Sequence, residues 1–421
     1  MRDLSDLKDE LEKCVRCGTC RSVCPVFRVA GREPSAARGK LTLIESYMKG
    51  EIGLTETYLK HLKECTLCGA CRQNCPNSVN TVEIFNAARI DAATKNGIPL
   101  AASLIFKNLL DDRILPWALK MATRLQGLIF KDSSVEKGLL SRFSLPIIGS
   151  GRLLPPLANK FFMELPEVKA LSKQEQGSKG PKIAFYAGCG INYLMPEVGT
   201  ATLEVLKKAG TRVIVPEGQV CCGMPAFSMG DEKIARNMAL KNLEAFEAHE
   251  FDFITTSCAT CGHGLKNLFR KLLGDNSELK DRVEAFCSKV RDITELLVNE
   301  LDYLNKAGNE KKGELIATYH DPCHLGRAQG LRDAPRYLIE KCSAVNLKEM
   351  KNPCSCCGLG GGLSTTNYDL SINITKRKVD NIKGSGADIV VTACPGCMVQ
   401  LRDGLHKFGV KAKVAHVVEL L

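Results

Sequence analysis

The stretch CSCCGLGGG at residues 354–362 places three cysteines in four positions and follows them with a run of glycines. A related stretch, VCCGMPA, occurs at residues 220–226. Around each adjacent pair, three more cysteines recur in the same order, at offsets of 134, 135, 135, 136 and 136 residues between the copies. The sequence therefore predicts a duplicated fold unit, because unrelated cysteines would not keep one frame.

Each copy alternates short apolar runs with helical patterns. The runs FDFITTS at 251–257 and ADIVVTA at 387–393 are rich in β-branched residues and end at a cysteine. In open α/β sheets, ligands gather at the carboxyl ends of the strands. We expect each set of cysteines to converge there, with Gly223 and Gly358 supplying the turn that adjacent cysteines need. The first set is Cys189, Cys221, Cys222, Cys258 and Cys261; the second is Cys323, Cys356, Cys357, Cys394 and Cys397.

Two other cysteine runs lie near the N-terminus: CVRCGTCRSVCP at 14–25 and CTLCGACRQNCP at 65–76. This is the bacterial ferredoxin pattern, in which three cysteines surround one [4Fe–4S] cube and the fourth reaches the other cube. Structural zinc is the alternative, but zinc favours separated C-x-x-C pairs. The pattern assigns Cys14, Cys17, Cys20 and Cys75 to one cube, and Cys65, Cys68, Cys71 and Cys24 to the other. Helical periodicity between the runs predicts a helical domain.

Composition agrees with metal binding. The chain has 421 residues, of which 44% are hydrophobic and 21 are cysteines. The charged N-terminus has no signal-peptide pattern, so we expect a cytoplasmic protein, in which so many cysteines favour metal over disulfides. The formal charge of +11 suggests nucleic acid, but it counts cysteines as neutral. Thiolates on metal would offset it, and we expect no nucleic-acid partner.

We expect an α+β protein in four parts. These are a helical domain with two [4Fe–4S] clusters (1–98), a helical connector with a polar linker at 171–182 (99–180), and two tandem α/β units (181–310 and 311–421). In the connector an apolar stripe is predicted on one helix, comprising Ile114, Trp117, Met121, Leu125 and Leu128. It would lie on an anionic membrane surface, dock on a partner, or pack against the chain's own domains.

Some conspicuous residues fall outside the repeated frame. Cys287, Cys342 and Cys354 are interpreted as small buried hydrophobic residues. His320 and His324 flank Cys323 and would either shuttle protons and tune a cluster or simply pack. The glycines after Cys357 do not form a dinucleotide fingerprint, since no strand precedes them, and are expected to let a cluster or substrate approach the backbone.

The pattern Cys…Cys-Cys-Gly…Cys-x-x-Cys resembles the CCG domain of the heterodisulfide reductase catalytic subunit and of the iron–sulfur subunits of glycolate oxidase and lactate dehydrogenase. Both sets of five cysteines are complete. The resemblance implies a noncubane [4Fe–4S] cluster at one or both sets, beside the two cubane clusters. Zinc or an empty site at one set is the alternative.

The resemblance also implies a function. The segment GREPSAARGKLTLIESYMKGE at 31–51 and the order of the domains resemble the glycolate oxidase and D-lactate dehydrogenase branch. The chain has no flavin or nicotinamide motif, so no FAD or NAD is expected on it. It would be the electron-relay subunit of a 2-hydroxy-acid dehydrogenase, taking electrons from a separate flavin-binding subunit to a quinone, an electron-transfer flavoprotein or a cytochrome.

Two other functions are weighed. A heterodisulfide reductase-like subunit would reduce a disulfide at a noncubane cluster, and a scaffold protein would bind zinc structurally. Peripheral contact with the inner face of the membrane remains open, and no catalytic residue is assigned.

Overall fold

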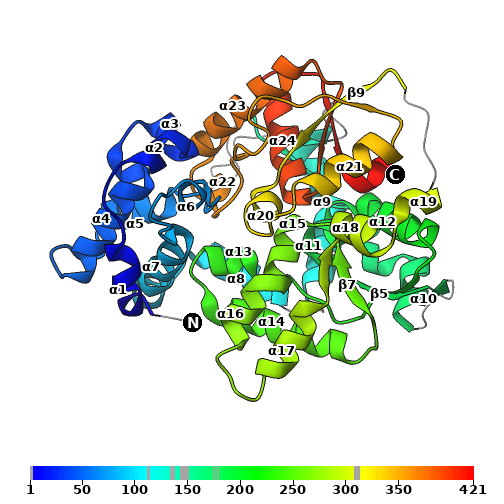
Figure 1. The fold of residues 1–421 in the computed structure, drawn as a ribbon, viewed down its shortest axis with the longest axis horizontal. Coiled ribbons are helices and arrows are strands. Elements are labelled where there is room, and N and C mark those ends of the chain that lie inside the picture. Colours follow the sequence, from blue (N-terminus) through cyan, green and yellow to red (C-terminus); the bar gives the residue numbers. More distant parts are fainter. Residues whose placement is uncertain are drawn as a thin grey trace.

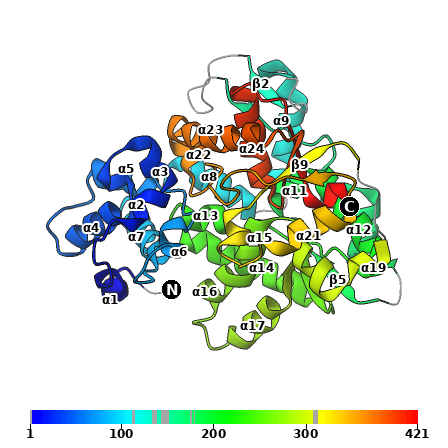
Figure 2. The same cartoon turned by 45° about the horizontal axis from the view of Figure 1, so that its top comes forward.

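The computed structural model describes residues 3–110, 114–132, 138–142, 151–173, 176–177, 180–307 and 313–421. Figure 1 shows an N-terminal helical domain standing to one side of two α/β units. We call these units the first repeat (residues 180–307) and the second repeat (residues 313–421). Figure 2, turned by 45°, shows the same separation of the N-terminal domain from the repeats. The predicted α+β architecture is confirmed.

The N-terminal domain is helical, as predicted. Its core gathers apolar side chains such as Ile44, Leu62, Ile84 and Phe85. The elements are η1 (Ser5–Leu7), α1 (Lys8–Glu12), α2 (Thr19–Val23), α3 (Pro25–Ala30), η2 (Glu33–Ser35), α4 (Ala37–Met48), α5 (Glu56–Lys63), α6 (Ala70–Gln73) and α7 (Thr81–Asn96). Helices α4 and α5 occupy the insert between the two cysteine runs, where the apolar periodicity predicted them.

The first repeat is built on a sheet of five strands in the order β4-β6-β5-β7-β8, in which only β4 is antiparallel to its neighbour. The strands are β4 (Gln176–Gly177), β5 (Lys182–Phe185), β6 (Arg212–Ile214), β7 (Phe253–Thr256) and β8 (Val290–Asp292). The helices are α11 (Gly188–Tyr193), α12 (Pro196–Lys208), α13 (Met224–Ser228), α14 (Glu232–Glu247), α15 (Ala259–His263), η4 (Gly264–Leu268), α16 (Phe269–Leu273), α17 (Lys280–Ser288), α18 (Ile293–Glu295), η5 (Leu296–Glu300) and α19 (Tyr303–Ala307).

The second repeat has the same topology in a parallel sheet of order β10-β9-β11-β12. The strands are β9 (Ile316–His320), β10 (Asn346–Leu347), β11 (Ile389–Thr392) and β12 (Lys413–His416). The helices are α20 (Cys323–Gly326), α21 (Asp333–Cys342), α22 (Leu363–Thr366), α23 (Tyr368–Ser385), α24 (Pro395–Lys407) and η6 (Val417–Leu420). Strands β5, β6, β7 and β8 correspond to β9, β10, β11 and β12, so the duplication seen in the cysteines extends to the fold.

The connector differs from its prediction. Besides α8 (Leu100–Leu110), α9 (Ile114–Ile129), η3 (Phe162–Glu164) and α10 (Pro166–Lys173), it contains a small antiparallel sheet of β1 (Phe130–Asp132), β2 (Leu139–Ser141) and β3 (Leu153–Leu154). The prediction of a polar linker at 171–182 is wrong for the described residues of that segment. Residues 171–173 form the end of α10, and residues 176–177 form β4, which pairs with β6. Polar composition does not prevent an edge strand from pairing through its backbone.

The described side chains of the apolar stripe of α9 are exposed to differing degrees. Trp117 is 68% exposed, Met121 39% and Leu125 49%, whereas the side chains of Ile114 and Leu128 lie outside the described residues. Intramolecular packing was therefore the wrong alternative for the exposed part of the stripe. Among the described helices, none combines the length and the apolar character needed to cross a lipid bilayer.

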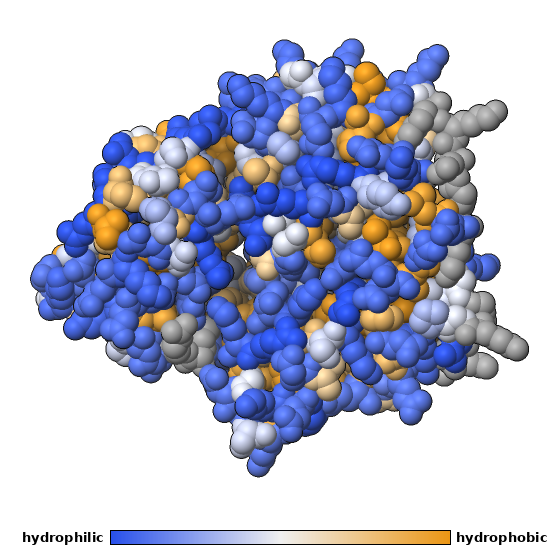
Figure 3. All heavy atoms as spheres, in the orientation of Figure 1, coloured by the Kyte–Doolittle hydropathy of each residue, from blue (hydrophilic) through white to orange (hydrophobic). Residues whose placement is uncertain are grey.

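The two repeats share one hydrophobic core, which runs from β5 and β7 to β9 and β11. Their strand ends meet directly, since the Ala259 backbone N–H donates to the Ala393 carbonyl over 3.1 Å. Most of the face drawn in Figure 3 is hydrophilic, and it is hollowed where the N-terminal domain meets the repeats. The cysteines that follow the strands consequently lie at a buried junction between domains.

Candidate metal centres

The cysteines of the first repeat converge at the carboxyl end of its sheet. Cys189 lies on α11 just after β5, and Cys258 directly follows the loop from β7. These two strands are neighbours that lead to opposite sides of the sheet, which is where α/β proteins place ligands. The Sγ atoms of Cys189 and Cys221 are 3.9 Å apart, and side-chain contacts link Cys222 to Cys261.

The second set has the same construction. Cys323 follows β9 and Cys394 follows β11, while the Sγ atoms of Cys357 and Cys397 are 3.7 Å apart. The turn after each adjacent pair is made by glycine, with φ of 79° at Gly223 and 106° at Gly358. The predicted turns are confirmed, and each set of sulfurs is brought to one place.

In each set the electrostatics favour the thiolate form at some sulfurs and disfavour it at others. Hydrogen bonds from the Cys221 and Cys261 thiols lower the pKa of Cys222, and those from Cys356 and Cys397 do the same for Cys357. For Cys323, burial raises the pKa. Metal ligation requires thiolates, and several buried sulfurs around one point are the donor set that an iron–sulfur cluster takes.

In the N-terminal domain the structure brings together the predicted crossed set. Cys24, from the first run, lines one hollow with Cys65, Cys68 and Cys71 from the second. Burial raises the pKa of Cys24 to about 12. Since a free thiol gains little from facing three others, this arrangement fits the ligand set of one cube.

The other predicted set lies around the first run. Cys20 interacts electrostatically with Cys14 and Cys17. Cys75 packs on the same hydrophobic core as Cys14 and Cys20, and the Asn77 side chain donates to the Lys13 carbonyl over 2.9 Å. This hydrogen bond joins the end of the second run to the beginning of the first, as the ferredoxin pattern requires.

Neighbouring sets touch through single cysteines. The thiols of Cys68 in the N-terminal domain and Cys356 in the second repeat are in hydrogen-bonding contact and share one small hydrophobic cluster. Cys394 in the second repeat is likewise hydrogen-bonded to Cys258 in the first. The sulfur sets therefore form a continuous series from the N-terminal domain through the second repeat to the first.

Buried cations lie beside this series, and the sequence analysis missed them. Lys378 on α23 donates to the carbonyls of Asn352 and Pro353 over 3.0 and 2.8 Å. Burial lowers its pKa to about 8. Asn242 holds the same place on α14 in the first repeat and donates to the Cys221 carbonyl over 3.1 Å. The second repeat thus carries a basic group where the first carries a neutral amide.

Two more cations join the domains. Arg89 on α7 and Arg327 after α20 are largely buried and donate to backbone carbonyls of other domains. The Arg327 guanidinium reaches the carbonyls of Cys68 and Cys354 at 3.4 and 2.6 Å. A single basic residue inside a helix pattern gives no local signal of such a role, so sequence reasoning had nothing to detect.

Histidines surround the junction of the two repeats. His324 Nδ1 is 3.1 Å from Thr260 Oγ1, which in turn is 3.6 Å from Cys394 Sγ. The ring of His324 stacks on His263 with centroids 5.1 Å apart. His320 is buried, and burial lowers its pKa to about 3, so its ring is neutral.

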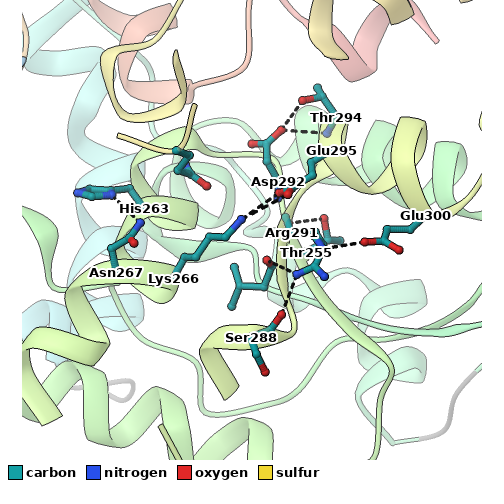
Figure 4. A network of polar contacts seen from close by, with 12 residues as sticks. Thr255, His263, Lys266, Asn267, Ser288, Arg291, Asp292, Thr294, Glu295 and Glu300 are labelled. Atoms are coloured by element: carbon teal, nitrogen blue, oxygen red, sulfur yellow. Dashed lines mark hydrogen bonds and ion pairs between the residues drawn. The ribbon is translucent and has the colours of Figure 1, made fainter. Parts of the chain in front are cut away.

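A polar network supports this region from the first repeat (Figure 4). It joins His263 to Asn267 and Lys266 to Glu295. Asp292 accepts from the Thr294 N–H and hydroxyl, and burial raises its pKa to about 7. Asp292 corresponds to His416 in the second repeat, and both residues cap the helix that follows the last strand.

The structure also describes two of the three cysteines outside the repeated frame and the glycine run after Cys357. Cys287 is buried, and its thiol donates to the Leu265 carbonyl over 3.1 Å, as expected of a residue outside the sets. Cys354 lies beside the second set, near Arg327 and Lys378. The side chain of Cys342 lies outside the described residues. The glycine run does permit a close approach, but the neighbour in the structure is protein backbone: a Cβ on Gly360 or Gly361 would meet the carbonyl of Thr66 or Cys65.

Replacing Cys357 by serine is expected to remove one centre and spare the cubes. Hydrogen bonds from Cys356 and Cys397 lower the pKa of Cys357, and its contact with Cys397 lies within its own repeat. We expect anaerobically purified protein to lose about four irons per chain, while the electron paramagnetic resonance of the cubes persists. Cys287→Ser is the matched control and should change neither. Loss of the cube signals in Cys357→Ser would show that the sets are not independent.

Comparison with known proteins agrees with this geometry. Residues 183–266 and 317–402 match the family described as Cysteine-rich domain (CCG), and residues 10–79 match the one described as 4Fe-4S dicluster domain. The first match covers β5 to β7 and β9 to β11 with their cysteines. The second implies two cubane [4Fe–4S] clusters in the N-terminal domain, and the cysteine sets of the repeats suggest further iron–sulfur sites.

Several relatives extend over nearly the whole chain. The Probable glycolate oxidase iron-sulfur subunit of Bacillus subtilis (strain 168) is 29% identical over 425 residues, which cover 98% of this chain and 93% of that protein. One subunit of the Dihydromethanophenazine:CoB--CoM heterodisulfide reductase of Methanosarcina acetivorans is 28% identical over 434 residues, with coverage of 98% and 93%.

Two further similarities were found, one in the sequence of part of the chain and one in the fold. Lactate utilization protein A of Exiguobacterium sp. is 31% identical over 241 residues, which cover 57% of this chain and 97% of that protein. The crystal structure of a hypothetical protein from Helicobacter pylori aligns with 99% of this chain and 74% of its own, at a TM-score of 0.51 and 9% identity, and so supports the fold alone. Taken with the matched domains and the geometry of the cysteines, these relatives show that the chain belongs to the CCG-domain family of iron–sulfur proteins, in a form with an N-terminal 4Fe-4S dicluster domain.

Proposed function

We propose that the chain is the electron-relay subunit of a flavin-dependent 2-hydroxy-acid dehydrogenase that oxidises glycolate or D-lactate. The observation that carries the relay is the series of touching sulfur sets. Cys68 meets Cys356, and Cys394 meets Cys258, so three of the four sets are linked by direct contacts. Such short separations favour electron transfer between the centres, whereas independent structural metal sites have no need of them.

The chain's own residues supply the ligands and the surroundings. The two N-terminal sets of four cysteines would hold cubane clusters, and the two sets of five would hold noncubane [4Fe–4S] clusters. When bound, such clusters accept and donate single electrons. The Arg327 guanidinium is buried at the contact between Cys68 and Cys356, and Lys378 is buried behind Cys357. Both cations would stabilise the extra negative charge of a reduced centre more than neutral groups would.

Substrate oxidation is assigned to a separate subunit. Removing a hydride from a 2-hydroxy acid needs a two-electron acceptor such as a flavin, and the sequence has no flavin motif. The similarity to the Probable glycolate oxidase iron-sulfur subunit, over almost the full length of both chains, favours a flavin-binding oxidase subunit as the electron donor. The acceptor would be a quinone, an electron-transfer flavoprotein or a cytochrome.

The relay is tested by reconstitution. The purified chain, loaded with clusters, should not oxidise glycolate or D-lactate in a dye-linked assay, and should pass electrons to the dye once the flavin-binding subunit is added. Cys356→Ser should lower this transfer at least about tenfold, because it breaks the contact with Cys68. Cys287→Ser, outside the sets, should leave it unchanged. Oxidation of either acid by the flavin-free chain would overturn the assignment.

A second candidate is reduction of a disulfide at a noncubane cluster. It is favoured by the completeness of both sets of five cysteines and by the similarity to the Methanosarcina heterodisulfide reductase chain over 98% of this sequence. The same purified chain distinguishes the two functions. Disulfide reduction with an artificial electron donor, without any flavin subunit, would support the second candidate and exclude the relay as the sole function.

A further inference from the structure

The two repeats differ in the residue three positions before the first cysteine of each set, at the end of β9 and directly after β5. The second repeat has His320 three positions before Cys323, and the first repeat has Tyr186 three positions before Cys189. The Tyr186 hydroxyl donates to the Val220 carbonyl over 2.5 Å, so its polar atom is already engaged in the fold. The equivalent histidine faces the Pro353 carbonyl without a well-aligned hydrogen bond.

His320 points at the cysteines of its own set. A ring nitrogen of His320 and the Sγ atoms of Cys357 and Cys397 all lie within 4.8 Å of one another. The residue is 1% exposed, and the only polar protein group that its ring faces among the described residues is the Pro353 carbonyl, with which it forms no well-aligned hydrogen bond. A buried imidazole without partners costs free energy. The ring nitrogen beside the two sulfurs is therefore available to bind a metal at that point.

Two of the other three cysteines of the set also contact cysteines of other domains. Cys356 contacts Cys68 of the N-terminal domain, and Cys394 contacts Cys258 of the first repeat. Cys357, Cys397 and His320 are thus the compact inner part of the second set. Neutral imidazole is a good ligand for iron and zinc, and histidine replaces cysteine on one iron of some iron–sulfur centres without adding negative charge.

We propose that the metal centre of the second repeat takes a nitrogen ligand from His320 beside its thiolates, whereas the centre of the first repeat is held by sulfur alone. The two centres of the duplicated fold are then chemically different. The imidazole adds no negative charge to the second centre, and the Lys378 ammonium makes its surroundings more positive than those of the first, where Asn242 stands. The second centre should consequently be the more easily reduced of the two.

The proposal rests on metal binding by the second set and is independent of the flavin subunit. The test uses the full chain, purified anaerobically, with and without histidine labelled with 15N. Pulsed electron paramagnetic resonance is recorded at the signal that Cys357→Ser removes. We expect a nitrogen coupling that changes with the label, that disappears in His320→Phe, and that persists in His324→Gln. His324 is the matched control, because it lies half-buried beside the same set but is bonded to Thr260.

Two results would overturn the proposal. One is a labelled wild-type protein whose signal shows no histidine coupling, a measurement that needs no variant and so does not depend on the folding of His320→Phe. The other is a coupling that survives His320→Phe. Neither result would affect the reconstitution assay, so failure of this proposal and failure of the relay are distinguishable.

Discussion

Replacing Gly361 by alanine is expected to open the junction between the N-terminal domain and the second repeat. Gly361 has φ of 65°, and a Cβ built on it would clash with the Cys65 carbonyl oxygen. No side-chain rotation relieves this clash, because the methyl group meets backbone. Left-handed strain alone costs about 1–2 kcal/mol, and overpacking adds about 1–3 kcal/mol. The two domains must therefore separate locally.

The change is measured by hydrogen–deuterium exchange over residues 60–70 and 358–364, together with the denaturant midpoint. Gly409→Ala provides a matched control, since Gly409 also has φ of 65° but has no atom within 4 Å of the added Cβ. It carries the strain without the clash. Protection that falls in Gly361→Ala and holds in Gly409→Ala assigns the effect to the junction. Equal behaviour of the two variants would mean that the domains do not press together there.

Replacing Arg89 by methionine is expected to destabilise the chain by at least about 3 kcal/mol. Arg89 is 5% exposed and donates to the carbonyls of Leu62, Cys65, Ser228 and Gly361, at distances of 2.6 to 3.0 Å. These acceptors belong to the N-terminal domain and to both repeats. Methionine fills a similar space without donors, and each buried carbonyl left unsatisfied costs about 1–3 kcal/mol.

Unfolding in denaturant under anaerobic conditions gives the comparison. Arg89→Lys should fall between wild type and Arg89→Met, because a single ammonium cannot reproduce the planar fork of five N–H groups. Arg282→Met removes an exposed ion pair with Glu247 and should leave the midpoint where it is. If Arg89→Met unfolds with the wild-type midpoint, the guanidinium is not what holds the three domains together.

Much of the fold and the cysteine sets could be predicted from the sequence, for a local reason. Strand ends are marked by β-branched runs that stop at Cys258 and Cys394, and the glycine after each adjacent pair signals a sharp turn. The constant offset between the copies fixed which cysteines belong together. The crossed arrangement of Cys24 with the second run also follows from a spacing rule, and the structure places it with Cys65, Cys68 and Cys71.

What could not be predicted involves contacts between distant segments. Nothing near Cys68 indicates that its thiol meets Cys356, and nothing near Arg89 indicates which carbonyls it will reach. Strand β4 was not predicted, because an edge strand of two residues pairs through its backbone and its side chains give no signal. The exposure of Trp117 depends on whether other segments of the chain cover α9. The periodicity of one helix carries no information about those segments.

The burial of the cysteine sulfurs has a consequence for how metal centres would be inserted into the protein. Cys221 and Cys222 are 3% and 2% exposed, and Cys394, which contacts Cys258 of the other repeat, is 2% exposed. A carrier that delivers iron and sulfide must touch the receiving thiols, and it cannot touch these once the domains have closed. Loading therefore has to precede closure. The hydrogen bonds of Arg89 and the packing of Gly361 on the Cys65 carbonyl would then form last, when the three domains close over the loaded centres.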